Sequence, residues 1–267
     1  MYIALDDWRR WAPDLATWLE ERFDTEVLEQ FDSNVEHDWL DWLDLRQAQI
    51  DGNHLDSVAL FEQVVRGRYA GVKVIHATRL VSLDSVREHG LRAWSEQELT
   101  EQALERFSGA ADGRRLGIAI EHCNPRHRGG RVYSFASLQH ALGTPHEDRS
   151  GKVPSFALHG GEFLAAVAMR SGIEEQLPGH GYLLACNLPW AWLDRDQITT
   201  LTKDILLSAI TTRFFNPGDY RMVGSHECIS TTRDIPPRHI ELVANIEDLR
   251  DRDDLTAEDI PWLLFQL

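Results

Sequence analysis

Three residues that could do chemistry stand far apart in the sequence, each in or beside a segment that we expect to be a strand. His76 follows a β-branched apolar run, Tyr133 lies in an alternating segment, and Glu227 is followed directly by Cys228 and Ile229. A histidine or tyrosine in such a place is most often structural, whereas a carboxylate in a buried strand is costly unless it is paired or functional. Glu227 is therefore the strongest single candidate for a functional residue.

Several common catalytic signatures are missing from the sequence. It contains no Gly-x-Ser-x-Gly, Walker loop, Gly-x-Gly-x-x-Gly or His-Glu-x-x-His. His122, Cys123 and His127 form a weak zinc signal because no second paired cluster accompanies them. We therefore expect no metal site, and no cysteine hydrolase built on the scattered cysteines.

The order and context of three motifs carry more information than any one residue. Val74-Ile-His76-Ala-Thr78 precedes a segment ending in Gly90-Leu91, Gly130-Arg-Val-Tyr133-Ser134-Phe-Ala136 follows, and Ser225-His-Glu227-Cys-Ile-Ser230 comes near the end. Together they resemble the ADP-ribosyltransferase superfamily. Within it they resemble the His–Tyr–Glu branch, which holds poly- and mono-ADP-ribosyl polymerases and diphtheria-type toxins. The resemblance covers about residues 71–246.

The resemblance implies NAD as the substrate. Breaking the nicotinamide–ribose bond passes through an oxocarbenium-like state with a cationic leaving group, so a carboxylate is needed more than an acid. Glu227 would offset that charge, Tyr133 would stack on nicotinamide, and His76 would donate a hydrogen bond to the other ribose. The residues implied to bind NAD are His76, Ala77, Thr78, Arg92, Tyr133 and Ser134.

The acceptor of the ADP-ribose stays open between protein and nucleic acid. Ser225 stands two residues before Glu227, so the paired glutamates of arginine-modifying relatives are missing. In the family that this chain resembles, the loop at 212–221 selects the acceptor. Its aromatic and basic side chains suit base stacking and protein docking equally; the candidate acceptor-binding residues are Phe214, Phe215, Tyr220 and Arg221.

A local excess of arginine stands out in an otherwise acidic chain. Between residues 113 and 131 Glu121 is the only acid, and five arginines accompany it: Arg114, Arg115, Arg126, Arg128 and Arg131. We expect a basic loop here. It could meet the NAD pyrophosphate or an anionic acceptor, or it could simply be solvated.

The elements that must position these residues are short strands mixed with helices. Helices are expected over 82–89, closed by Gly90, over 96–107 and over 162–169, and strands over 182–186 and 239–243. Because no regular βαβ alternation is present, we expect an α+β protein. The resemblance implies a split β-sheet core of the ADP-ribosyltransferase type.

Residues 1–70 differ in composition from the rest of the chain. They hold 16 acidic against 6 basic residues, and five of the nine tryptophans lie in the first 42. The spacing of the tryptophans predicts amphipathic helices with the rings in a core; the alternative is a docking surface for a basic partner. We therefore expect an acidic helical region over 1–70 and a catalytic domain over 71–267.

Composition excludes several broad classes. The chain of 267 residues is 43% hydrophobic and 26% charged, which is typical of a folded globular protein. Its apolar stretches are too short to span a bilayer, and its first residues are acidic, unlike a signal peptide. Three scattered cysteines favour a reducing cytoplasm. The net charge of −16 disfavours nonspecific binding to nucleic acid or membrane.

The leading prediction is NAD-dependent transfer of ADP-ribose to a macromolecule, as in a toxin or defence protein. An NAD glycohydrolase, with water as acceptor, is the closest alternative. An RNA 2′-phosphotransferase shares the fold and NAD but relies on basic residues where this chain has a glutamate. The non-enzymatic alternative is an interaction protein with a vestigial transferase fold.

Overall fold

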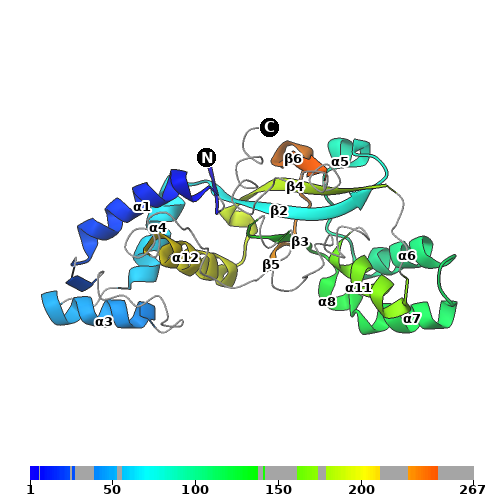
Figure 1. Cartoon of the computed structure of the whole chain (residues 1–267), viewed down its shortest axis with the longest axis horizontal. Helices are drawn as coiled ribbons and strands as arrows, with labels where there is room; N and C mark the ends of the chain where they lie inside the picture. Colours follow the sequence, from blue (N-terminus) through cyan, green and yellow to red (C-terminus); the bar gives the residue numbers. More distant parts are fainter. Residues whose placement is uncertain are drawn as a thin grey trace, which may run out of the picture. The chain divides into compact units, whose positions relative to one another are not determined.

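The chain is an α+β protein, as predicted, in which helices accompany a six-stranded, mostly antiparallel sheet (Figure 1). The structure is a computed structural model and describes residues 1–5, 7–24, 26–27, 39–52, 56–137, 141, 161–173, 179–210 and 228–245. Its contacts divide the chain into two compact units. One consists of residues 1–72 and 189–226, and the other of residues 73–188 and 227–267.

Helices build the first unit around a core that includes tryptophan. They are α1 (Trp8–Arg22), α3 (Trp39–Asp51), α4 (Ser57–Arg68) and α12 (Arg195–Ile210), with the short strand β1 (Tyr2–Ala4) and the 3-10 turn η1 (Trp190–Trp192). α12 packs against α1 and α4. Trp11 and Trp18 are buried, and the Trp18 ring lies 5.3 Å from that of Phe61. Trp11 and Trp18 therefore serve as core, as their helical spacing predicts.

One buried carboxylate joins two of these helices. Glu62 of α4 is only 4% exposed, and its Oε1 accepts hydrogen bonds from Arg66 in the same helix and from Arg195 at the start of α12. A buried carboxylate is tolerated when cations compensate it. The pair with Arg195 thus fixes where α12 meets α4, although the two residues are far apart in the sequence.

The second unit is built on antiparallel strand pairs. Its sheet order is β5 (Cys228–Thr231), β3 (Val132–Phe135), β2 (Gly71–Leu80), β4 (His180–Pro189) and β6 (Ile240–Asn245), while β1 pairs with β2 off this path. In the register, Phe135 stands opposite both Ile75 and Cys228, and Tyr133 stands opposite Ser230. Because directly opposite residues share a face, Tyr133, Phe135 and Cys228 lie on the same face of the sheet.

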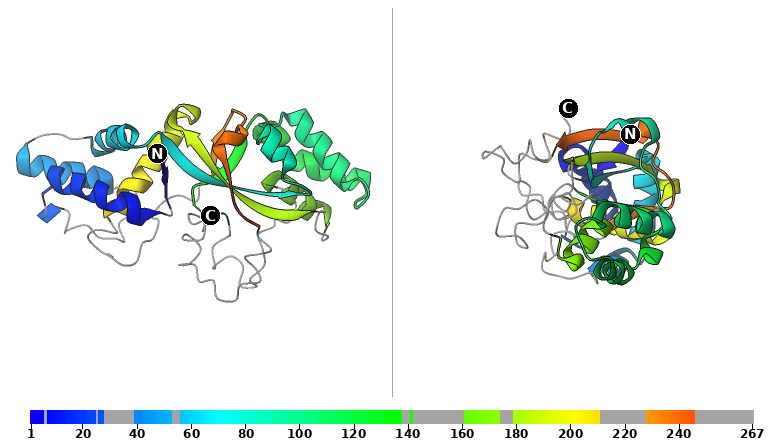
Figure 2. Two further views of the ribbon diagram at one scale, coloured as in Figure 1. Left: turned by 90° about the horizontal axis from the view of Figure 1, so that it is seen from above. Right: turned by 90° about the vertical axis from the view of Figure 1, so that its right-hand side faces the viewer.

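Three helices of this unit pack against one another: α6 (Glu96–Phe107), α7 (Gly113–His122) and α11 (Glu162–Ser171). Figure 2 shows them side by side from above. Their shared core includes Phe107, Leu116 and Val167, all fully or almost fully buried. The expected helix over 96–107 agrees with α6, and the expected helix over 162–169 falls within α11. None of the described helices is long and apolar enough to cross a membrane.

The expected basic loop between residues 113 and 131 is wrong, because most of this segment is helical. It forms α7 and the single turn α8 (Pro125–Arg128). Asp112 caps α7 by accepting hydrogen bonds from the backbone N–H groups of Arg114 and Arg115, which favours a helix start. Burial of Leu116, Ala119 and Ile120 outweighs the low helix propensity of the glycines in this segment.

A glycine closes α5 (Asp84–His89) and lets two distant segments meet. Gly90 has φ +79° and ψ −157°, a backbone conformation that L side chains rarely adopt. The next residue, Leu91, exchanges backbone hydrogen bonds of 2.9 and 2.8 Å with Ile235, just before the 3-10 turn η3 (Pro237–His239). A Cβ at Gly90 would collide with the Ile235 carbonyl oxygen.

We expect Gly90→Ala to lower the free energy of unfolding by at least about 2 kcal/mol, because it adds backbone strain and a clash. Gly117→Ala is the matched control. Gly117 lies inside α7 with no atom close to its would-be Cβ, so the same change should be neutral or stabilise by up to about 1 kcal/mol. Urea unfolding of both variants measures the effect. Equal stability of the two variants would contradict this reading of Gly90.

Candidate functional site

A cavity of about 860 Å³ lies in the second unit. It is bordered by β2, β3, α5, α6, the segments that follow α5 and α8, the start of α11 and the first residue of β5. Every residue that the sequence implied for NAD binding lines it, namely His76, Ala77, Thr78, Arg92, Tyr133 and Ser134. The fold thus brings together residues that the sequence places in separate segments.

The strand order explains this convergence. β2 carries His76, its neighbour β3 carries Tyr133, and β5 on the far side of β3 begins at Cys228. Cys228 lines the cavity. Glu227, the residue before it, lies outside the described part of the chain, and so do the acceptor residues Phe214, Phe215, Tyr220 and Arg221.

His76 is held by the backbone of the neighbouring strand. Its Nδ1 lies 2.8 Å from the carbonyl oxygen of Tyr133. Since a carbonyl oxygen only accepts, Nδ1 carries the proton, and in the neutral ring Nε2 is left as an acceptor. Burial lowers the pKa of His76, and the hydrogen bond to Tyr133 opposes that shift only in part. The neutral imidazole therefore offers Nε2 as a hydrogen-bond acceptor.

Tyr133 is held at both ends. Its backbone belongs to the β3–β5 ladder, and its hydroxyl donates a hydrogen bond of 3.1 Å to the carbonyl oxygen of His127 in α8. The ring is half-buried and borders the cavity. An aromatic ring fixed in this way can offer a stacking surface with little further loss of entropy.

Two smaller residues of the predicted set are buried in the cavity wall. Thr78 is 6% exposed and stands two positions after His76 in β2. Ser134 is 1% exposed, and its hydroxyl has no hydrogen-bond partner among the residues that the structure describes. A buried hydroxyl without a partner is costly, so a polar group that reached it would be stabilising.

The cavity concentrates positive charge in a protein whose net charge is −16. Glu105 is the only carboxylate among its described lining residues, and it stands against five arginines: Arg79, Arg92, Arg106, Arg128 and Arg131. Arginine binds phosphate oxygens through two parallel hydrogen bonds. The sequence analysis named Arg92, Arg128 and Arg131 as candidate binding residues. It did not identify Arg79 and Arg106, because only the fold brings the end of β2 and α6 to the same cavity.

Neighbouring groups hold several of these arginines in place. Arg92 donates a hydrogen bond of 2.7 Å to Glu98, and its guanidinium lies 5.1 Å from the centre of the Trp94 ring. Glu98 also closes the capping box of α6 with Ser95. Hydrogen bonds from Ser95, with Arg92 nearby, hold the pKa of Glu98 below its usual value, so the carboxylate stays charged for both partners.

Two further arginines are bonded to neutral acceptors of the second unit. Arg79 is only 7% exposed and donates to the carbonyl oxygen of Gly179, and Arg131 donates to Ser230 Oγ at 2.9 Å. Both hydrogen bonds hold a guanidinium group in a fixed position at the cavity. The cavity is therefore preorganised for an anion.

The arginine cluster that the sequence indicated is divided by the fold. Arg128 and Arg131 line the cavity, whereas Arg114 and Arg115 line a separate groove between α7 and α11. Arg126 is exposed on α8 and lines neither of the two. Within the described ranges, no group of three or more His, Cys, Asp or Glu side chains is placed to hold a metal ion.

No protein-family model matches the chain, no curated protein matches it, and no solved structure matches it. The resemblance to ADP-ribosyltransferases stays a prediction from the motifs.

We expect the pKa of His76 to lie below 6.5, with the proton on Nδ1 in the neutral ring. At pH values between the pKa of His76 in the folded chain and 6.5, His76 binds a proton in the unfolded chain but not in the folded chain. The contribution of His76 to stability is therefore complete above about pH 6.5 and falls as the pH drops through that window.

Heteronuclear NMR of the imidazole measures the pKa and the tautomer, and urea unfolding at about pH 7.5 and 5.5 measures the stability. His76→Gln keeps a donor for the Tyr133 carbonyl but cannot titrate, so the variant should lose less stability than the wild type at the lower pH. A pKa above 6.5, or a neutral ring protonated on Nε2, would contradict this assignment.

Proposed function

We propose that the protein is an ADP-ribosyltransferase that uses NAD, releases nicotinamide and transfers ADP-ribose to a macromolecule. The observation that carries the proposal is a cavity whose lining includes five arginines together with His76, Thr78 and Tyr133. Motif order in the sequence and convergence in the fold are separate observations, and both support the same ligand.

NAD fits the chemistry of the cavity. Its pyrophosphate carries two negative charges, which the arginines would bind. The flat nicotinamide ring would stack on Tyr133, and a ribose hydroxyl would donate to Nε2 of His76. A volume of about 860 Å³ lies within the usual range of small-molecule sites, roughly 300–1,000 Å³.

The transfer breaks the bond between the ribose C1 and the nicotinamide nitrogen. The electron pair of that bond stays on the nitrogen and neutralises the pyridinium charge, while the ribose becomes oxocarbenium-like. Glu227 would stabilise this positive charge by electrostatic attraction, with its role taken from the family resemblance. The acceptor's nucleophile then bonds to C1 and releases its proton to water.

Hydrolysis of NAD differs from transfer only in the nucleophile. Incubation of the full chain with adenylate-labelled NAD and a cell lysate separates the outcomes. Label on protein or on nucleic acid supports transfer and names the acceptor class, whereas free ADP-ribose alone supports a glycohydrolase. If the protein neither consumes nor binds NAD, the proposal is overturned. The result would then favour the non-enzymatic alternative, an interaction protein with a vestigial transferase fold.

We expect Glu227→Gln to lower NAD turnover by roughly a hundredfold to a thousandfold, because removing one preorganised electrostatic contact to the transition state commonly costs that much. NAD affinity should change little, since the contact strengthens mainly as the bond breaks. Glu88→Gln on α5 removes the same charge from an exposed position and serves as the control. Full turnover by a folded Glu227→Gln variant would overturn the mechanism.

The two arginines of the single turn α8 form a matched pair for testing the cavity. Arg128 lines it and Arg126 does not. We expect Arg128→Gln to weaken NAD binding about tenfold and to reduce its salt dependence, because a charge close to the pyrophosphate is lost. Arg126→Gln should bind NAD as the wild type does. Calorimetric titration at low and high salt provides the measurement, and equal effects of the two changes would argue against pyrophosphate binding here.

A further inference from the structure

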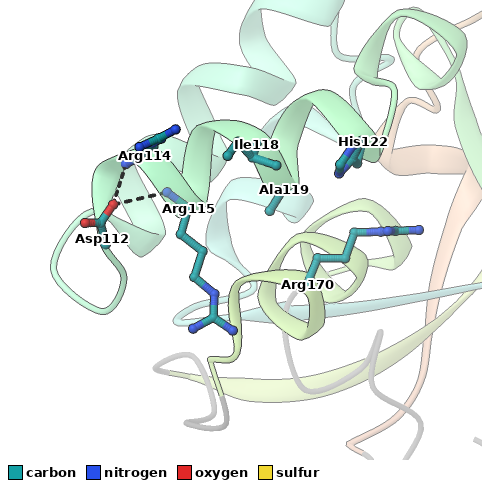
Figure 3. Close-up of a pocket in the computed structure, with 7 residues that line it drawn as sticks. All are labelled: Asp112, Arg114, Arg115, Ile118, Ala119, His122 and Arg170. Carbon is teal, nitrogen blue, oxygen red and sulfur yellow. Dashed lines mark hydrogen bonds between the residues drawn. The ribbon is translucent and has the colours of Figure 1, made fainter.

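A second basic site lies between α7 and α11, in a groove of about 330 Å³ (Figure 3). Arg114 and Arg115 reach it from the first turn of α7, His122 from the last turn, and Arg170 from the last turn of α11. Asp112 is the only carboxylate among its described lining residues. The NAD proposal makes no use of this groove.

The side chains of α7 form a stripe along the groove. Arg115, Ile118 and His122 are spaced i, i+3 and i+7, so they lie on one face of the helix. The seven-residue step between Arg115 and His122 corresponds to about 10 Å along the helix axis. Ile118, 47% exposed, separates them. The groove is therefore an elongated surface with polar nitrogen donors at both ends and an apolar centre.

The arginines do not converge on one point. Figure 3 shows the two side chains diverging: Arg115 extends downward from α7, and Arg170 extends to the right from α11. This arrangement fits a ligand with several negative charges in a row.

The positive charge of the groove is not compensated by the residues that the structure describes. Asp112 uses its Oδ1 to accept from the backbone N–H groups of Arg114 at 2.7 Å and Arg115 at 3.1 Å, as the cap of α7. Among the described residues, no carboxylate forms an ion pair with Arg114, Arg115 or Arg170. Arg114 and Arg170 thus keep charges that a ligand could use.

The fold fixes one of these arginines in place. The guanidinium of Arg115 lies over Gly172, which ends α11 with φ +71°. A Cβ at Gly172 would come within 2.6 Å of Arg115 Nη2. The negative end of the α11 dipole favours a cation at this place, so Arg115 is held without an acidic partner.

The groove is separate from the cavity but lies close to it along one helix. Phe163 and Leu164, at the start of α11, line the cavity, whereas Arg170, in its last turn, lines the groove. The six-residue step from Leu164 to Arg170 corresponds to about 9 Å along the helix.

We propose that this groove binds the sugar–phosphate backbone of a nucleic-acid strand. Successive phosphates provide negative charges in a row, arginine is well suited to phosphate, and the apolar centre at Ile118 can contact sugar or base. Because a net charge of −16 disfavours nonspecific attraction of a polyanion, a nucleic acid would bind only at a local basic site such as this groove. The inference does not rest on the proposed NAD chemistry.

Fluorescence anisotropy of a short labelled single-stranded oligonucleotide, titrated with the full chain in the absence of NAD, tests the proposal. The test variant is Arg114→Gln/Arg170→Gln, which leaves the packed Arg115 intact. We expect its affinity to fall about tenfold or more at low salt, and the slope of log K against log salt to decrease by about 0.7 for each lost phosphate contact. Arg126→Gln, which removes an exposed arginine of the same unit, should bind like the wild type.

The arginines of the cavity are tested by a separate variant, because they could also attract the oligonucleotide. If Arg128→Gln weakens oligonucleotide binding and Arg114→Gln/Arg170→Gln does not, the strand binds at the cavity and the proposal is overturned. Equal binding by the wild type and the groove variant also overturns it, as does tighter binding of a poly-glutamate peptide of the same charge. Loss of oligonucleotide binding in the groove variant with NAD binding unchanged supports the proposal, whatever the fate of the NAD mechanism.

Discussion

The cavity depends on the hydrogen-bonded register of β2, β3 and β5. Phe135 stands opposite both Ile75 and Cys228, so one residue of β3 sets the positions of both neighbouring strands. A slip of one residue would turn every side chain of β3 to the other face and exchange Tyr133 for Ser134. The bond from His76 to the Tyr133 carbonyl adds a side-chain contact to this register, so it would be lost with any slip.

The arginines of the cavity impose a second constraint, because like charges gathered in one place repel. The structure reduces this cost by bonding Arg92 to Glu98, and Arg79 and Arg131 to neutral oxygen atoms. These bonds orient the guanidinium groups, and Glu98 contributes a compensating charge to Arg92. An anionic ligand would relieve the remaining repulsion, so binding and folding stability are linked at this site.

Local signals in the sequence were sufficient for some elements and insufficient for others. The helix over 96–107 agrees with α6 because Ser95 and Glu98 form a capping box, which is local information. α7 was missed although Asp112 caps it, since its two glycines disfavour a helix and its helical state also depends on burying Leu116 and Ile120. The meeting of His76 with Tyr133 depends on strand pairing over a long sequence separation, so the motifs predicted the members of the site but not their contacts.

Charge distribution, and not net charge, decides which ligands this protein can hold. At physiological salt the charges of exposed groups are screened beyond about 8 Å, so a ligand in the cavity or in the groove responds mainly to the side chains that line it. Both sites are arginine-rich, although the chain as a whole carries −16. The acidic remainder of the surface lowers nonspecific attraction for polyanions. The same net charge that argues against general nucleic-acid binding thus makes binding at a local basic groove more selective.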